Sequence, residues 1–400
     1  MDSIGERSVS PVTARRAALL AGILLIAANL RSPLTVVGPL LGTISRHFSL
    51  SPTEAGLLNT LPVLGFGAFS PLAPPLSRRL GIERALLAAM IALCGGIVLR
   101  SLPSAVCLFG GTILIGAAVA IVNVLLPALV KRRFPGRISS ITGLYAATMS
   151  MIAAIGSGVA VPLAGVAPGG WRTALGCWAG LALVAAAFWL PQAARGGRPA
   201  EVAGAGNMPL RSSLAWLVTA FMGLQSFGFY VMIGWAPTLL VSRGDSPHIA
   251  GLQLFVYQVV GLLSSLLSPL VLERTRSQSL LACVCALLCC SGYAGLILLP
   301  SLSLLWLMVT GAGAGACLVI ALSFMSLRTA GPHQAAGLSA MAQCVGYLFA
   351  STGPLIFGFL HQSTGGWLPS MLVLQGSAVI LAGVAVAAGR PVQMEPDRTG

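Results

Sequence analysis

One arginine in this sequence stands where a charge is least expected. Arg31 lies in the middle of an apolar run, within a segment that reads NLRSPLTVVGP from Asn29 to Pro39. A charged side chain at the centre of a membrane-spanning helix costs roughly 2.5–3.5 kcal/mol on insertion scales. The guanidinium is always charged, and its planar fork of donors suits carboxylate or nitro oxygens. The type and place of this residue therefore predict a binding site for an anionic or electron-rich solute.

No acidic residue is placed to neutralise Arg31. The nine acids all map to termini, loops or helix ends: Asp2, Glu6, Glu54, Glu83, Glu201, Asp245, Glu273, Glu395 and Asp397. The unpaired cation needs water, backbone carbonyls or an arriving anion. We interpret Arg31 as the substrate-binding cation; the structural alternative is that it bonds the carbonyls of a helix broken near Pro33. Either a break that frees backbone groups for substrate or an ordinary proline kink would follow from Pro33.

Other polar and aromatic side chains lie at a depth comparable to that of Arg31. We predict that they contact the same solute: Asn29, Thr35, Asn123, Tyr145, Gln225, Tyr230, Tyr257, Gln258, Gln343 and Tyr347. Thr35 shares a helix face with Arg31, and Tyr347 shares one with Gln343, because side chains four residues apart lie together. Polar side chains in spans also serve helix–helix hydrogen bonds, and that alternative stays open for each of them.

The sequence lacks the residues that proton transfer, ATP binding, metal binding or nucleophilic catalysis would require. The four histidines map to loops or helix ends, so no Asp, Glu or His is expected at mid-depth to carry a proton. Uniport, anion exchange and co-transport with a protonated solute stay open. The sequence has no phosphate-binding loop for ATP, no metal-ligand spacing and no nucleophile–base pairing. We therefore expect no cofactor, no metal and no catalytic residue, with a membrane enzyme or sensor as the alternative from another class.

The composition decides which elements must hold these side chains. The chain has 400 residues, of which 56% are hydrophobic and only 8% are charged, whereas a soluble domain carries about 25% charged residues. Long apolar stretches recur from end to end, which predicts an all-α polytopic membrane protein. The net charge of +14 raises the question of a nucleic-acid partner. Because the basic residues are scattered between apolar runs, we interpret them as topology signals and expect no nucleic acid. The nine cysteines fall inside apolar runs and read as buried, inert thiols.

Twelve apolar stretches have the roughly 20 residues that a bilayer requires. The predicted spans are residues 17–41, 53–76, 83–100, 105–129, 138–161, 171–190, 213–240, 248–271, 278–298, 302–326, 335–358 and 367–388. Residues 191–212, rich in Gly, Ala, Arg and Pro, read as a cytoplasmic linker. We therefore expect an N-terminal six-helix bundle over residues 1–190 and a C-terminal one over residues 213–400.

Basic residues set the expected orientation. With the N-terminus inside, eighteen Lys and Arg residues lie on the cytoplasmic side, and only Arg46, Arg100, Arg172 and Arg243 lie outside. This asymmetry predicts that both termini are cytoplasmic.

The two halves repeat each other at an almost constant offset. SPTEAGL, starting at Ser51, returns as SPHIAGL, starting at Ser246, and Arg133 meets Arg328 at the same distance. Two parallel six-helix repeats are the architecture of major facilitator transporters.

The chain resembles the major facilitator superfamily over essentially its whole length. The NLRSPLTVVGP segment and the LSRRLGIER loop, from Leu76 to Arg84, are similar to its cyanate transporter and 2-nitroimidazole exporter branch. In that loop Arg78 stands where the superfamily has an acid. The resemblance implies a multi-pass, monomeric transporter of the bacterial inner membrane that moves small solutes, some of them anionic, by alternating access. An exporter of nitroimidazole-type drugs with a mainly apolar pocket is the alternative.

Overall fold

The computed structural model describes residues 11–134, 137–195, 208–274, 278–330 and 332–394. These residues form α-helices and short 3₁₀ turns, with no strand among them. Twelve helical stretches are long and apolar enough to cross a membrane. The predicted all-α class and the number of spans are confirmed.

Most helices begin and end within a few residues of the predicted limits. The first half contains α1 (Pro11–Ala28), α2 (Ser32–Thr35), α3 (Val37–Phe48), α4 (Pro52–Phe69), α5 (Ala73–Leu80), α6 (Ile82–Arg100), α7 (Ala105–Arg133), α8 (Ile138–Val166), α9 (Trp171–Gly176) and α10 (Trp178–Ala194). The second half contains α11 (Ser213–Ser242), α12 (Pro247–Arg274), α13 (Gln278–Leu298), α14 (Ser303–Leu327), α15 (Pro332–Thr364) and α16 (Leu368–Ala388).

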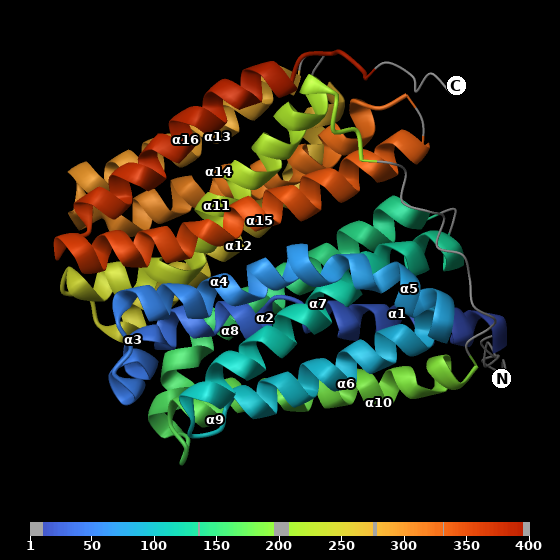
Figure 1. The fold of residues 1–400 in the computed structure, drawn as a ribbon, viewed down its shortest axis with the longest axis horizontal. Helices are drawn as coiled ribbons and strands as arrows, with labels where there is room; N and C mark the ends of the chain where they lie inside the picture. Colours follow the sequence, from blue (N-terminus) through green and yellow to red (C-terminus); the bar gives the residue numbers. More distant parts are fainter. Residues whose placement is uncertain (1–10, 135–136, 196–207, 275–277, 331, 395–400) are drawn as a thin grey trace, which may run out of the picture.

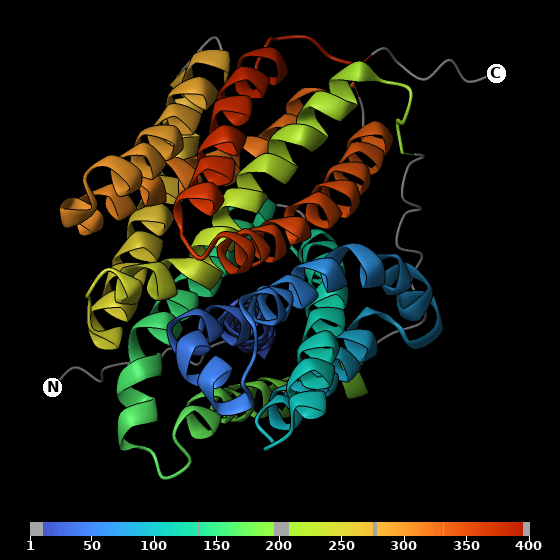
Figure 2. The same cartoon turned by 60° about the vertical axis from the view of Figure 1, so that its left-hand side comes forward.

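The two halves form two bundles that lie side by side (Figures 1 and 2). Helix α4 packs against α15 across the boundary, α8 packs against α12, and α3 packs against α11. Helix α1 begins and α16 ends at the same end of the molecule (Figure 1), which we call the terminal end. The opposite end, where α3 ends and α4 begins, is the distal end.

The halves approach each other most closely near the distal end. A Cβ atom built on Gly38 would lie 2.2 Å from the Ile233 carbonyl oxygen, and one on Gly56 would lie 2.5 Å from that of Pro354. Asn59 Nδ2 also donates across the boundary to the Gly234 carbonyl at 3.5 Å. Glycine at these positions lets the backbones touch, so the distal end is closed.

The first span is not one helix but three pieces. Helix α1 ends at Ala28, and Asn29, Leu30 and Arg31 form a turn before α2 begins at Ser32. Pro33 explains the interruption, because proline has no N–H for the carbonyl four residues earlier and its ring clashes with that carbonyl. Of the two readings of Pro33, the structure has the break rather than the simple kink.

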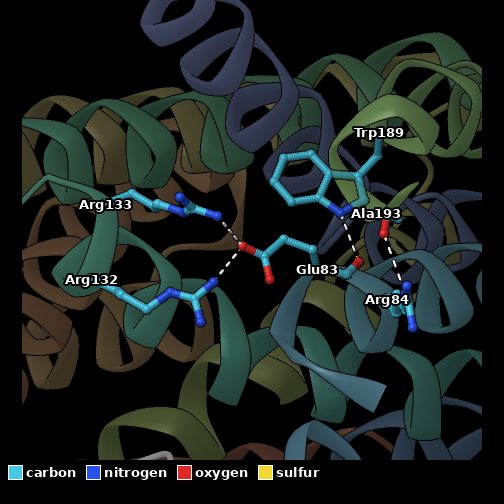
Figure 3. A network of polar contacts seen from close by, with 6 residues as sticks. All are labelled: Glu83, Arg84, Arg132, Arg133, Trp189 and Ala193. Carbon is cyan, nitrogen blue, oxygen red and sulfur yellow. Dashed lines mark hydrogen bonds and ion pairs between the residues drawn. The ribbon is translucent and has the colours of Figure 1, made fainter. Parts of the chain in front are cut away.

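A buried charge network fixes α6 and α7 near the terminal end (Figure 3). The Glu83 carboxylate, 2% exposed, pairs with the guanidinium groups of Arg132 and Arg133, and the Trp189 indole donates to the Glu83 carbonyl at 2.9 Å. In the second half Arg328 donates to Gln278 Oε1 at 2.9 Å. Gln278 and Arg328 each follow their first-half counterparts, Glu83 and Arg133, by the same offset, so the repeat seen in the sequence is also a repeat of contacts.

Candidate functional site

The broken first span is held in place by neighbouring helices. Thr35 Oγ1 donates to the Ala153 carbonyl of α8 at 2.9 Å, and Ser157 Oγ of α8 donates to the Thr35 carbonyl at 3.2 Å. From α6, Arg100 Nη1 donates to the Pro33 carbonyl at 2.6 Å. Backbone groups freed by the break are thus satisfied inside the protein, as groups at membrane depth must be.

Arg31 projects from this break to the boundary between the halves. Its Cζ lies 5.0 Å from the centroid of the Phe229 ring of α11, a distance typical of a cation–π contact. Within the described part of the chain, the guanidinium of Arg31 has no hydrogen-bond partner and no ion-pair partner. Contrary to the structural alternative, it bonds none of the carbonyls of the broken helix; one of them, that of Pro33, accepts from Arg100. The donors of Arg31 are therefore unused among the described residues.

Arg31 lines two neighbouring cavities, which meet at Tyr230, Leu318 and Tyr347. The first, which we call the central chamber, encloses about 600 Å³ of empty space among α8, α11, α12 and α14. Tyr257, Gln258 and Gln225 line it, together with Phe229 and Ser226.

The second cavity, which we call the vestibule, encloses about 930 Å³ of empty space and extends from Arg31 toward the terminal end. Asn123, Tyr145 and Gln343 line it, from α7, α8 and α15. Its other walls are mostly apolar, and Phe66 of α4 contributes an aromatic ring. The chamber and the vestibule together form one path that reaches the middle of the protein from the terminal end.

Nine of the eleven predicted site residues line one or both cavities: Arg31, Asn123, Tyr145, Gln225, Tyr230, Tyr257, Gln258, Gln343 and Tyr347. The glutamines already have partners inside the protein. Gln258 Nε2 donates to Ser157 Oγ at 2.7 Å, and Gln343 Nε2 donates to Ser339 Oγ at 2.9 Å. The hydroxyl of Tyr257, a residue of the chamber lining, is by contrast buried without a hydrogen-bond partner among the described residues.

Asn29 and Thr35 are not brought to the cavities. Asn29 Nδ2 donates to the carbonyls of Leu25 at 2.8 Å and Leu181 at 3.4 Å, and the residue is fully buried. Thr35 is 2% exposed and bonds to Ala153. Asn29 bonds to a carbonyl at the end of α1, and Thr35 bonds across to α8. Thr35 remains one helical turn from Arg31, because its N–H donates to the Arg31 carbonyl at 3.0 Å, but its side chain bonds to α8 and does not line a cavity.

Sequence reasoning predicted two rings of the aromatic wall near Arg31, Tyr230 and Tyr347, but missed the other two, Phe229 and Phe66. The ring centroid of Tyr230 lies 5.3 Å from that of Phe229 and 6.3 Å from that of Tyr347, and the Tyr347 centroid lies 5.6 Å from that of Phe66. Phe229 follows Gln225 by four residues, so the helix-face rule used elsewhere would have found it. Among the aromatic residues only tyrosines were considered.

Sequence reasoning counted Arg100 among the few basic residues on the non-cytoplasmic side but did not predict that it is buried. Arg100 is 1% exposed and lies within the first bundle. Its position at the end of an apolar stretch gave no sign that its long side chain turns inward to Pro33.

This arrangement can hold a compact or planar solute. A guanidinium with free donors fixes oxygen or nitrogen lone pairs, and the rings of Phe229, Tyr230 and Tyr347 offer flat apolar surface. None of the described residues that line the chamber or the vestibule is Asp, Glu or His. The described part of the chain also has no cluster of metal ligands.

Comparison with known proteins fits this fold and site. Residues 19–354 match the Major Facilitator Superfamily. The chain is 42% identical to the 2-nitroimidazole transporter of Escherichia coli K12, over 94% of this chain and 96% of that one. It is 28% identical to the cyanate transport protein CynX of the same organism, over 88% of this chain and 91% of that one.

A solved structure shares the fold at low sequence identity. The inward-facing, unoccupied bacterial homolog of the human lysosomal transporter Spinster superposes with a TM-score of 0.79 at 17% identity, over 97% of this chain and all of that one. The chain is therefore a multi-pass membrane transporter of small solutes and not an enzyme; it belongs to the major facilitator superfamily, in the branch of the 2-nitroimidazole and cyanate transporters.

Proposed function

We propose that this protein moves a small anionic or electron-rich solute across the bacterial inner membrane, with Arg31 as the cation that binds it. One observation carries the proposal: Arg31 is an unpaired guanidinium, without a partner among the described residues, where the chamber and the vestibule meet. The names of two relatives support it, since cyanate is an anion and 2-nitroimidazole carries electron-rich nitro oxygens.

The solute would reach Arg31 by alternating access of the two bundles, over residues 1–190 and 213–400. The distal end is closed by backbone contacts such as that of Gly38 with Ile233, while the vestibule extends toward the terminal end. The excess of Lys and Arg on that side supports cytoplasmic termini. In this orientation the protein is closed to the outside and open to the cytoplasm. We propose that it acts as a monomer.

Coupling would not pass through a carboxylate in the site. The described cavity walls contain no Asp, Glu or His, and proton-driven carriers commonly place such groups in their spans. Uniport, anion exchange and co-transport of a protonated solute are the transport modes that require no Asp, Glu or His in the cavity lining.

The second candidate is export of neutral nitroimidazole-type drugs. The aromatic wall of Phe66, Phe229, Tyr230 and Tyr347 favours it, because flat heterocycles pack on such rings. The two candidates differ in what Arg31 does, since an anion requires its charge and a neutral ring requires only its donors.

Counterflow in proteoliposomes separates the two. We expect Arg31→Ala to lower the affinity for cyanate by about 10- to 100-fold, the range for loss of a charge-assisted hydrogen bond. Arg31→Lys, which keeps the charge, should retain part of the affinity for cyanate. Arg46→Ala, at an exposed arginine of α3, is the matched control and should leave both solutes unaffected.

The pattern of loss then decides between the candidates. If 2-nitroimidazole uptake falls in Arg31→Ala and cyanate was never transported, the drug-export reading holds. If neither solute depends on Arg31, the proposed role of this arginine is wrong.

A further inference from the structure

A fully buried arginine lies beyond the central chamber, toward the distal end. Arg100 is the last residue of α6 and is 1% exposed. Its Nη1 donates to the Pro33 carbonyl at 2.6 Å, but its Nε and Nη2 are buried and have no hydrogen-bond partner. An arginine does not lose its proton in a protein, so the full charge and two unused donor nitrogens remain inside the bundle.

These donors belong to a small pocket of their own. The pocket has a cavity volume of about 20 Å³, and we call it the distal pocket. Tyr230, which also lines the chamber and the vestibule, forms its wall on the terminal side. Asn59 and Gly234, which bond across the two halves, form its wall on the distal side. The distal pocket therefore lies between the solute cavities and the distal closure.

The charge of Arg100 has no partner of opposite sign in this pocket. None of the described residues that line it is acidic. Burying a charge without a counter-charge costs several kcal/mol, and water can fill the free donors but cannot neutralise the cation. An anion does both. Because the cavity volume of the distal pocket, about 20 Å³, is small beside the 200 Å³ of the vestibule, only a compact anion fits.

We propose that the distal pocket is a second anion site, in which a halide-sized or cyanate-sized ion binds Nε and Nη2 of Arg100. This ion is either a resident halide that neutralises Arg100 or the transported solute on its way past Tyr230. The site stands on Arg100 alone and does not depend on the role proposed for Arg31.

Crystals of the full-length protein grown with bromide, and others with selenocyanate, test the site by anomalous scattering. We expect a peak beside Arg100 that is lost in Arg100→Gln and kept in Arg31→Gln. A peak with bromide alone identifies a resident halide, and a peak with selenocyanate identifies passage of a cyanate-like solute. No peak at Arg100 with either ion, or a peak that survives Arg100→Gln, overturns the proposal. A peak at Arg100 without one at Arg31 contradicts the function proposed for Arg31 and supports this second site.

A solution measurement keeps the test valid if Arg100→Gln does not fold. In the Arg31→Gln protein, Arg100 is the remaining cation of the path, so replacing gluconate by bromide at constant ionic strength should raise the unfolding temperature by mass action. The rise should disappear in the Arg31→Gln/Arg100→Gln double variant. If Arg31→Gln shows no rise, the distal pocket does not bind a halide and that arm of the proposal is wrong; the same titration with cyanate tests the other arm.

Discussion

At the scale of single residues, the site combines a cation from one half with rings from the other. Arg31 comes from the break in the first span, and Phe229, Tyr230 and Tyr347 come from α11 and α15. The ring of Phe229 faces the guanidinium at 5.0 Å and keeps it in place without using its donors. A carboxylate in the same position would hold Arg31 more tightly and would compete with an anionic solute.

The first prediction concerns Phe229. In Phe229→Leu the cation–π contact is lost but the apolar volume is nearly kept, so we expect solute affinity to fall by about 2- to 30-fold, the equivalent of about 0.5–2 kcal/mol. Phe229→Trp, which keeps an aromatic ring, should retain the solute affinity. Phe188→Leu, at an exposed ring of α10, is the control, and binding measured by solute-dependent thermal shift gives the comparison. An affinity equal to that of the unmodified protein in Phe229→Leu would show that the ring does not help to place Arg31.

At the scale of elements, the break in the first span and the Glu83 network decide where the site lies. Asn29 and Ser32 bond to carbonyls at the end of α1, and Arg100 and Thr35 bond across to other helices. The break is therefore a supported structure, unlike a flexible kink. The network of Glu83 with Arg132 and Arg133 fixes the terminal ends of α6 and α7, and α7 carries Asn123 to the vestibule.

The second prediction concerns this network. Glu83→Ala leaves two arginines without their acid. Because Arg132 and Arg133 are 32% and 40% exposed, water solvates them in part, and we expect a cost of about 1.5–3 kcal/mol, the range for hydrogen bonds to charged groups. We expect a clear drop in the unfolding temperature in detergent, with solute affinity unchanged in the protein that remains folded. Glu54→Ala removes an exposed helix-capping carboxylate and should have a smaller effect. Equal effects of the two variants would mean that burial of Glu83 adds nothing to stability.

Much of the element scale was predictable from the sequence, and the reason is physical. A bilayer requires apolar stretches of one length, so the limits of helices such as Gln278–Leu298 could be placed closely. The same rule says nothing about which face of a helix turns inward. The inward direction of the Arg100 side chain therefore could not be predicted, although the apolar stretch around it was clear. Glu83 also went unrecognised as a buried acid, because its partners come from α7, about fifty residues away.

The candidate site was predictable where one residue had a single explanation. Arg31 has no acid within its span, and this alone predicted that its side chain faces water or a solute. Asn29 was predicted by its depth and Thr35 by its place one turn after Arg31, but both side chains bond to carbonyls of Leu25 and Ala153 and line neither cavity. Phe229 could have been proposed from its place four residues after Gln225, but its contact with Arg31 depends on the packing of the halves, which the sequence does not give.

At the scale of the whole molecule, the closed distal end depends on glycine. Gly38 allows α3 to touch the backbone of α11 at Ile233, and Gly56 allows α4 to touch α15 at Pro354. A side chain at either position would push the bundles apart. The conformation that is closed distally thus requires these two positions to stay without a Cβ atom.

The third prediction compares two glycines of α3. The Cβ of Gly38→Ala would lie 2.2 Å from a backbone oxygen, whereas the Cβ of Gly42→Ala would meet nothing within 4 Å. We expect Gly38→Ala to destabilise the distally closed state by about 1–3 kcal/mol, the usual cost of overpacking, and to slow counterflow at least several-fold. Gly42→Ala should transport normally. Thiol labelling of a cysteine introduced at Asn59 would report the opening, and equal labelling in the two variants would contradict it.

The distal closure has a consequence for how the protein responds to its medium. Among the described residues no ion pair joins the two halves; the bundles meet through backbone at Gly38 and Gly56 and through uncharged hydrogen bonds at Asn59 and Thr53. Screening by salt weakens charged contacts and leaves such neutral contacts almost untouched. The distal closure should therefore open and close at similar rates in dilute and in concentrated electrolyte. Any dependence of the transport rate on ionic strength should originate from the attraction of the solute to Arg31.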